Sequence, residues 1–246
     1  MSLRYAVLIP ARYQSSRFPG KPLAEINGKT MIQHVWEKCV SAVGEDLVYI
    51  ATDDQRIVNE VKSFGGKALM TSSECLTGTD RLAEANITLN FDFIINVQGD
   101  EPMIDPNDII KIRDIFLEDP TRVVNAYTQI SEHEDPYSNT LPKVVVSKSS
   151  DLLYMSRAAI PISKSGELQI CFKQVCIYAF SKSHLNFFAT NPEKTPLESI
   201  EDIEILRFLE NDIKIKMVEV GNFGIAVDTV EDLEKVKLLL NSTEKN

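Results

Sequence analysis

Short apolar runs alternate with amphipathic segments in the first half of the chain. The apolar runs predict strands, and segments with apolar residues at helical spacing predict helices. We expect strands at 5–9, 47–51, 67–70 and 91–97, and helices at 31–43, 54–64 and 78–86. This alternation is typical of βαβ units, so the fold class is α/β. Trp36 lies on the apolar stripe of the first helix, which indicates a core residue and not a platform for a base.

The second half of the chain is less regular. We expect a helix at 107–117, strands at 123–128, 143–148 and 172–180, a helix at 200–211, a strand at 213–220 and a helix at 230–240. Thr229 is an N-cap candidate for the last helix, with Asp232 in capping-box position. A chain of 246 residues suits one α/β domain. We predict a single domain, 1–246, with an inserted lobe at roughly 128–200 that covers the site and pairs two subunits.

The loop after the first strand is rich in cations. Arg12, Arg17 and Lys21 lie in it, with the hydroxyl of Ser15 between them and few hydrophobic side chains around them. Pro10 cannot donate to a strand ladder, so we expect it to end the strand. Three cations within an acidic chain favour a polyanionic ligand such as a triphosphate, and a solvated surface loop is the alternative.

Composition and charge narrow the classes of partner. The chain is 43% hydrophobic, with a net charge of −10 and a pI near 4.9. This acidity argues against nucleic acid and against an anionic membrane as partners, and leaves small anionic substrates. The four cysteines have no metal-ligand spacing, so we expect reduced thiols in a cytoplasmic protein. We expect no signal peptide, and no apolar run reaches the roughly 18 residues of a membrane span.

Two acidic residues follow apolar strands. Asp100 comes shortly after the strand at 91–97, and Asp228 follows the apolar residues 225–227. Ligands in open α/β sheets bind beyond the carboxyl ends of the strands, so both carboxylates can reach one site. Two carboxylates and a triphosphate suit Mg²⁺, which binds few protein carboxylates and keeps phosphate oxygens and waters. The alternatives are a helix-capping role for Asp228 and a turn-forming role for Asp100.

Six segments together carry a resemblance to a known family. In chain order they are IPARYQSSRFPGKPL, ATDD, TGTDRLAEA, NVQGDEPMI, YMSRAAIP and VDTVEDLEKV. They resemble the CMP-KDO synthetases, the 3-deoxy-manno-octulosonate (KDO) cytidylyltransferases of lipopolysaccharide synthesis. The resemblance implies a Rossmann-like nucleotide-sugar transferase sheet, mixed but mostly parallel, with an insertion used for dimer contacts. It also implies a cytoplasmic, magnesium-dependent homodimer.

The implied reaction transfers CMP from CTP to the anomeric hydroxyl of KDO and releases pyrophosphate, for lipopolysaccharide or capsule synthesis. By resemblance the catalytic residues are Arg12, Lys21, Asp100 and Asp228, with both aspartates as magnesium ligands. The resemblance assigns nucleotide contacts to Arg12, Ser15, Arg17, Lys21, Thr77, Gly78, Thr79 and Arg81. It assigns sugar contacts to Gln98, Arg157, Gln174, Tyr178 and Glu204. For Thr77 and Thr79 a plain helix cap is the alternative.

Three departures from the family pattern affect the expected contacts. Gln174 stands where the family usually has histidine, and Ile205 where it usually has glutamine. Both changes replace sugar contacts, so a related 3-deoxy-2-ulosonate such as 8-amino-KDO is an alternative acceptor. Cys75 and Thr77 stand where histidine and serine are usual, which affects the contacts with the base.

Two other classes of protein remain as alternatives. A nucleotidylyltransferase for sugar 1-phosphates would be expected to have a glycine-rich GxGTR-type opening loop, which this chain lacks. A non-catalytic homologue would be expected to have lost Lys21 or one of the two aspartates, and all three are present.

Overall fold

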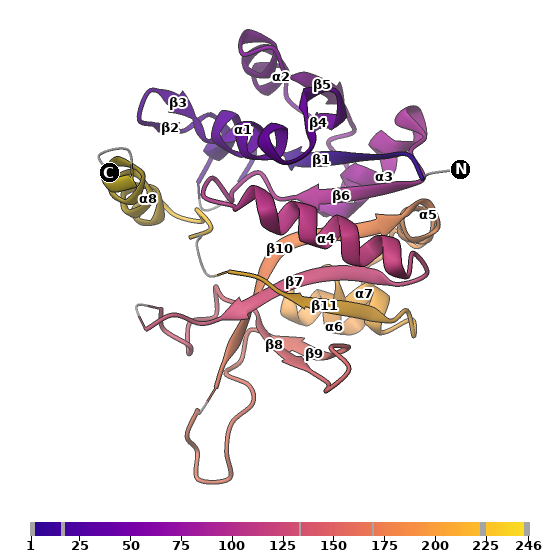
Figure 1. Cartoon of the computed structure of the whole chain (residues 1–246), viewed down its shortest axis with the longest axis vertical. Helices are drawn as coiled ribbons and strands as arrows, with labels where there is room; N and C mark the ends of the chain where they lie inside the picture. The colour runs from indigo at the N-terminus through magenta and orange to yellow at the C-terminus, as the bar shows by residue number, and fades with distance from the viewer. Residues whose placement is uncertain (1–2, 16–17, 133, 169, 222–224, 244–246) are drawn as a thin grey trace.

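A single mixed sheet organises the fold (Figure 1). The computed structural model describes residues 3–15, 18–132, 134–168, 170–221 and 225–243. Seven strands lie side by side in the order β11-β7-β10-β6-β1-β4-β5. Their bounds in chain order are β1 Tyr5–Ala11, β4 Val48–Thr52, β5 Lys67–Met70, β6 Phe93–Val97, β7 Val123–Gln129, β10 Phe172–Ser181 and β11 Ile215–Glu219. β10 runs antiparallel to both of its neighbours and the other pairings in this row are parallel, which confirms the mixed, mostly parallel sheet.

Helices cover both faces of the sheet. On one face lie α1 (Met31–Val43), α2 (Gln55–Ser63) and α4 (Pro106–Glu118), whose apolar stripes pack on one side of the central strands. On the other lie α3 (Gly78–Leu89) and α5 (Lys182–Thr190), followed by the short helices α6 (Pro196–Glu201) and α7 (Leu206–Leu209). Two apolar cores result, one on each face. Trp36 packs against the first of them, with its ring 5.0 Å from that of Phe64, which confirms its core role.

Two further strands extend the sheet at one end of β10. β8 (Lys143–Val146) pairs with both β10 and β9 (Leu152–Ser156) in antiparallel fashion. β10 therefore runs from this small antiparallel region into the middle of the main sheet, as Figure 1 shows. Because β10 also pairs with β6, this small antiparallel region lies next to the carboxyl end of β6.

The last helix, α8 (Val230–Thr243), returns across the molecule from the edge strand β11. It lies beside the hairpin of β2 (Glu25–Ile26) and β3 (Lys29–Thr30), close to the opening loop (Figure 1). A separate apolar cluster fixes it there, formed by Ile26, Met31, Val227, Leu233 and Val236.

Three expectations about the elements need correction. β1 continues through Pro10 to Ala11, because its ladder with β6 stops at Leu8 and only the ladder with β4 goes on. A proline is tolerated in a strand that has a neighbour on one side only. The helix expected at 200–211 is two helices, separated at Asp202, which has a left-handed φ of 50°. The strands β2, β3 and β9 and the helix α5 were not predicted from the sequence.

Other expectations are confirmed. α1 and β5 have the predicted bounds, and the remaining predicted elements occur with ends shifted by a few residues. None of the helices in the described part of the chain is long and apolar enough to cross a membrane. The four cysteines are free thiols.

Candidate active site

A cavity of about 1150 Å³ opens beyond the carboxyl ends of β1 and β6. The order of connections reverses between these two strands, since β1 leads to β4 on one side while β6 lies on the other, and such switch points form ligand crevices. The predicted site residues that line the cavity are Arg12, Ser15, Lys21, Thr77, Gly78, Arg81, Gln98, Asp100, Arg157, Gln174, Tyr178, Glu204 and Asp228. Thr79 does not line it, and Arg17 lies outside the described residues.

The opening loop is closed by a tight turn that aims Lys21 inward. Gly20 has a left-handed φ of 73°, and its N–H donates to the carbonyl of Tyr13 at 2.9 Å. A side chain at Gly20 would meet the Tyr13 ring at 3.2 Å, so the turn requires glycine for both reasons. Ser15 stabilises the same loop by accepting from the N–H of Phe18. Arg12 lies exposed at the mouth of the cavity.

Lys21 lies between the two predicted metal ligands. Its Nζ is 2.7 Å from Oδ2 of Asp100 and 3.4 Å from Oδ1 of Asp228. Burial lowers the pKa of Lys21, but the charges of the two aspartates and their hydrogen bonds outweigh burial, so the pKa is raised. The two carboxylates therefore share one positive charge, although they are far apart in the sequence.

The chain holds these two aspartates together through the backbone. The N–H of Val227 donates to the carbonyl of Asp100 at 2.9 Å. Thr229, and not Asp228, caps α8: its Oγ1 accepts from the N–H of Asp232, whose carboxylate accepts from the N–H of Thr229. The predicted capping box is confirmed, and the Asp228 carboxylate remains directed at the cavity.

The first turn of α3 lines the same cavity. Thr77 is the N-cap, and its Oγ1 and N–H both bond to the carboxylate of Asp80 in a capping box. Gly78 faces Gln98 so closely that an added Cβ would lie 2.8 Å from its Nε2. The side chain of Thr79 is fully buried, and its N–H donates to Oε2 of Glu204 at 3.1 Å. For Thr77 the capping role and a place in the cavity wall therefore coincide.

Arg81 and Cys75 are held by partners within this wall. The buried guanidinium of Arg81 donates to Oγ1 of Thr71 at 2.6 Å and to the carboxylate of Asp53 at 2.9 Å. Cys75 donates to Glu84 at 3.3 Å, and burial together with this carboxylate raises the pKa of Cys75 to about 12. Cys75 is thus a neutral thiol in the cavity wall.

A β-bulge shapes the opposite wall. The pairing of β10 with β7 shifts between Val175 and Tyr178, and the side-chain amide of Asn125 donates to the carbonyls of Val175 and Ile177 inside the bulge. Nε2 of Gln174 donates to Oδ1 of Asn125 and to Oη of Tyr178, each at 3.0 Å. Bulges commonly re-aim side chains beside active sites. Here the bulge brings Gln174 and Tyr178 onto the cavity side.

Arg157 and Glu204 complete this wall. The guanidinium of Arg157 donates to the carbonyls of Glu201, Asn139 and Asp202 at 2.5, 2.8 and 3.0 Å. A guanidinium has five N–H groups, so two are not committed to these carbonyls. Burial raises the pKa of Glu204, partly offset by the hydrogen bond from the N–H of Thr79.

Ile205 does not belong to this wall. Its side chain is fully buried in the apolar core formed with α3 and α5. Ile205 itself therefore offers no contact to a ligand in the cavity, and the loss of a sugar contact at this position stays a prediction. The break between α6 and α7 turns Glu204 to the cavity and Ile205 to the core.

Several residues at the cavity were missed in the sequence. Asn125 is buried behind the cavity wall, where it holds the β10 bulge and Gln174, and it could have been found because it is a polar residue within an apolar strand. Glu101 is buried beside Asp100, and burial and the charge of Asp100 raise the pKa of Glu101 to about 7. Lys235 reaches the cavity from α8, and no local pattern in the sequence indicates that.

Comparison with known proteins identifies the family. A cytidylyltransferase family model matches residues 6–215. The chain belongs to the cytidylyltransferase family. A 3-deoxy-manno-octulosonate cytidylyltransferase of Escherichia coli is 42% identical over 95% of both chains. An 8-amino-3,8-dideoxy-manno-octulosonate cytidylyltransferase of Shewanella frigidimarina is also 42% identical, over 97% of this chain and 99% of the relative.

A solved structure of the family agrees with this fold. A CMP:2-keto-3-deoxy-manno-octonic acid synthetase in complex with CTP superposes with a TM-score of 0.89 at 41% identity, covering 98% of this chain and 99% of the other. The resemblance to the CMP-KDO synthetases is thereby confirmed. Residues from five of the six motif segments line this cavity, and the sixth, ATDD, meets it only through the bond of Asp53 to Arg81.

Proposed function

We propose that this cytidylyltransferase transfers CMP from CTP to the anomeric hydroxyl of KDO and releases pyrophosphate. The observation that carries the proposal is the arrangement of Lys21, Asp100 and Asp228 in one cavity of a chain 41% identical to a structure solved with CTP. The acceptor oxygen attacks the α-phosphate in line with the departing pyrophosphate. Such a reaction depends mainly on positioning and on neutralising the phosphate charge.

The cationic residues bind the triphosphate. Arg12 at the mouth of the cavity and Lys21 at its floor supply positive charge, and Ser15 lies between them in the sequence. Arg17 of the same loop is assigned to the nucleotide by resemblance. Thr77 and Gly78 of the first turn of α3 and the guanidinium of Arg81 are assigned to the cytosine and ribose. Thr79 does not line the cavity and supports this turn through its bond to Glu204.

Asp100 and Asp228 fit a magnesium site. The donors are hard carboxylate oxygens that already converge on one cation, the ammonium of Lys21. The described residues contain no group of three or more acidic, histidine or cysteine ligands, so water and phosphate oxygens would complete the coordination. When bound, Mg²⁺ would neutralise part of the negative charge of the phosphates. The protein's own part is to hold the two carboxylates together through the bond from Val227 to Asp100.

The acidic sugar is assigned to the wall built around the β10 bulge. Arg157 binds the ulosonate carboxylate, while Gln98, Gln174, Tyr178 and Glu204 contact the hydroxyls. A guanidinium suits a carboxylate better than an ammonium does, because it can form two parallel hydrogen bonds. Relatives named for KDO and for 8-amino-KDO are equally similar, so 8-amino-KDO is the second candidate acceptor.

The region 128–200 supports a homodimer. It carries five large exposed apolar side chains, those of Tyr137, Leu153, Ile162, Ile170 and Ile200, with exposed fractions of 54–79%. A second copy of the chain covering these residues would remove apolar surface from water. We place the homodimer in the cytoplasm, where its product feeds lipopolysaccharide or capsule synthesis.

Pyrophosphate release tests the function. Purified protein with Mg²⁺ and CTP should release pyrophosphate with KDO, and a parallel reaction with 8-amino-KDO ranks the two acceptors. Glucose 1-phosphate and buffer alone are the negative controls. Release with glucose 1-phosphate but with neither ulosonate would indicate a sugar 1-phosphate enzyme. No release with any acceptor would indicate a non-catalytic homologue.

A further inference from the structure

A buried arginine outside the cavity connects its two walls. Arg207 in α7 is fully buried and does not line the cavity. Its Nε and Nη2 donate to the two carboxylate oxygens of Glu198, each at 2.7 Å, in a bidentate pair. Its Nη1 donates to the carbonyl of Asn191 at 3.1 Å, and the guanidinium lies 3.7 Å from the centre of the Phe188 ring. Arg207 is thus anchored on both α5 and α6.

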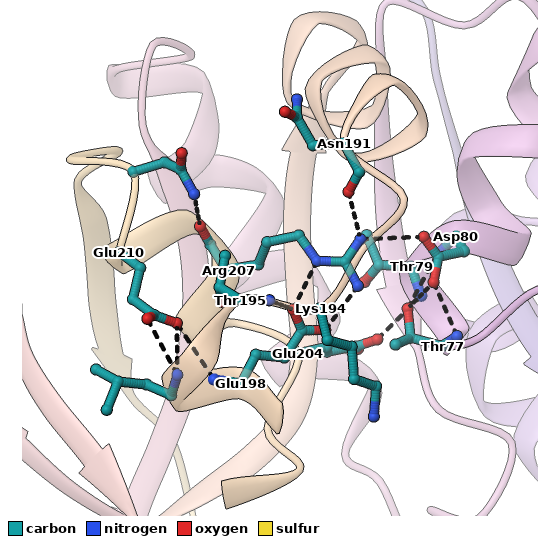
Figure 2. A network of polar contacts seen from close by, with 12 residues as sticks. Thr77, Thr79, Asp80, Asn191, Lys194, Thr195, Glu198, Glu204, Arg207 and Glu210 are labelled. Carbon is teal, nitrogen blue, oxygen red and sulfur yellow. Dashed lines mark hydrogen bonds and ion pairs between the residues drawn. The ribbon is translucent and has the colours of Figure 1, made fainter. Parts of the chain in front are cut away.

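The same guanidinium reaches the first turn of α3 (Figure 2). Nη1 of Arg207 lies 3.3 Å from Oδ1 of Asp80, while the other oxygen, Oδ2, accepts from the N–H and the hydroxyl of Thr77. Asp80 therefore uses one oxygen to cap α3 and the other to bond Arg207. This fixes the turn that carries Thr77 and Gly78 to the segment 198–207.

A second link joins the same two segments. Oε2 of Glu204 accepts from the N–H of Thr79, and Gln98 approaches Oε1 of Glu204 at 3.5 Å. Glu204 belongs to the proposed sugar wall and Thr77 to the proposed nucleotide wall. Arg207 is three residues from Glu204, so its anchoring also fixes the backbone that presents this carboxylate.

We propose that Arg207 is a positioning residue for the transfer reaction. It sets the distance between the α3 turn, which faces the nucleotide, and Glu204, which faces the acceptor. This inference rests on the proposed function. A group that touches neither substrate can still control the rate in this way, because a displacement of about 1 Å between reacting groups can cost on the order of a hundredfold.

Substitutions at the contact between Arg207 and Asp80 test the proposal. Asp80→Asn keeps an oxygen for the cap but removes the charge that Arg207 pairs with. Arg207→Lys keeps a positive charge but loses the bidentate fork. Asp80→Glu keeps both the charge and the capping box, since glutamate suits this position of a helix start. Arg122→Lys is the matched control, because Arg122 pairs with Asp151 and neither residue lines the cavity.

The readouts are CTP affinity by calorimetry without acceptor, and kcat and KM for each substrate, at a temperature where each variant is folded. We expect Asp80→Asn and Arg207→Lys to lower CTP affinity and kcat by about tenfold or more. Asp80→Glu and Arg122→Lys should stay within about threefold of the parent chain. Unchanged CTP affinity and kcat in folded Asp80→Asn would overturn the proposal, and that variant decides alone if Arg207→Lys does not fold.

The calorimetric arm separates this inference from the proposed function. If the parent chain binds CTP but transfers CMP to neither ulosonate, the proposed acceptor is wrong. The effect of Asp80→Asn on CTP affinity then still tests the positioning role of Arg207. If CTP affinity is lost equally in the Arg122→Lys control, the effect is one of general stability and the positioning role is refuted.

Discussion

Replacing Lys21 by methionine should destabilise the protein in a way that Mg²⁺ reverses. The ammonium of Lys21 lies 2.7 and 3.4 Å from two carboxylates, and the side chains are 16% and 27% exposed. Exposed ion pairs contribute about 0–1 kcal/mol, and breaking buried ones costs about 3–5 kcal/mol. For this half-buried trio we expect a loss of about 2 kcal/mol, since two carboxylates are left to repel each other. In a chain of this size that lowers the Tm by about 4–8 °C.

Thermal melting with and without millimolar Mg²⁺ is the assay. In Lys21→Met no ammonium competes for the carboxylates, so Mg²⁺ should raise its Tm more than that of the parent chain. Lys67→Met is the matched control, because Lys67 pairs with Asp46 on the surface, where the carboxylate side chain is fully exposed. Lys67→Met should lower the free energy of unfolding by no more than about 1 kcal/mol, so its Tm should fall only slightly. Mg²⁺ should not alter this change. A Lys21→Met protein that melts at or above the parent temperature, and gains nothing extra from Mg²⁺, would refute the reasoning.

Three further predictions use other parts of the molecule. Asp100→Asn and Asp228→Asn should each lower kcat by at least about a hundredfold with little change in Tm, and normal turnover in both would contradict the metal assignment. Burial lowers the pKa of His184, so stability should fall as the pH drops below about 6.5, and His184→Gln should lose this dependence in melts between pH 8 and 5. Gln174→His should change the ratio of kcat/KM for KDO to kcat/KM for 8-amino-KDO. Ile205→Gln should leave that ratio unchanged. It should instead lower the free energy of unfolding by about 1–3 kcal/mol, because the amide is buried without a partner.

The sequence was most informative where the signal is local. Asp100 follows the strand β6, and the rule that ligands bind beyond the carboxyl ends of strands was sufficient to place it at the site. Asp228 follows an apolar run that is not a strand, and the bond from the N–H of Val227 to the carbonyl of Asp100 brings it there. The opening loop was predictable for the same reason, because its cations are close in sequence and its turn is formed by Gly20. The helix α1 has a complete amphipathic stripe, and its bounds were predicted to the residue.

The parts that were not predicted depend on breaks in regular structure. A left-handed Asp202 divides the expected helix at 200–211, and this decides that Glu204 faces the cavity while Ile205 enters the core. The bulge in β10 depends on the side chain of Asn125 from another strand. Contacts across such distances leave no periodic signal in the sequence, so spacing alone could not reveal them.

The position of Asp228 has a consequence for the order in which the enzyme becomes active. This carboxylate belongs to the segment that follows β11, and its neighbour Val227 is a buried member of the apolar cluster that seats α8. When all the strands of a nascent chain have emerged from the ribosome but α8 has not, Asp100 lies beside Lys21 without Asp228. On the proposed function, which needs both carboxylates, the site is complete only when α8 has docked.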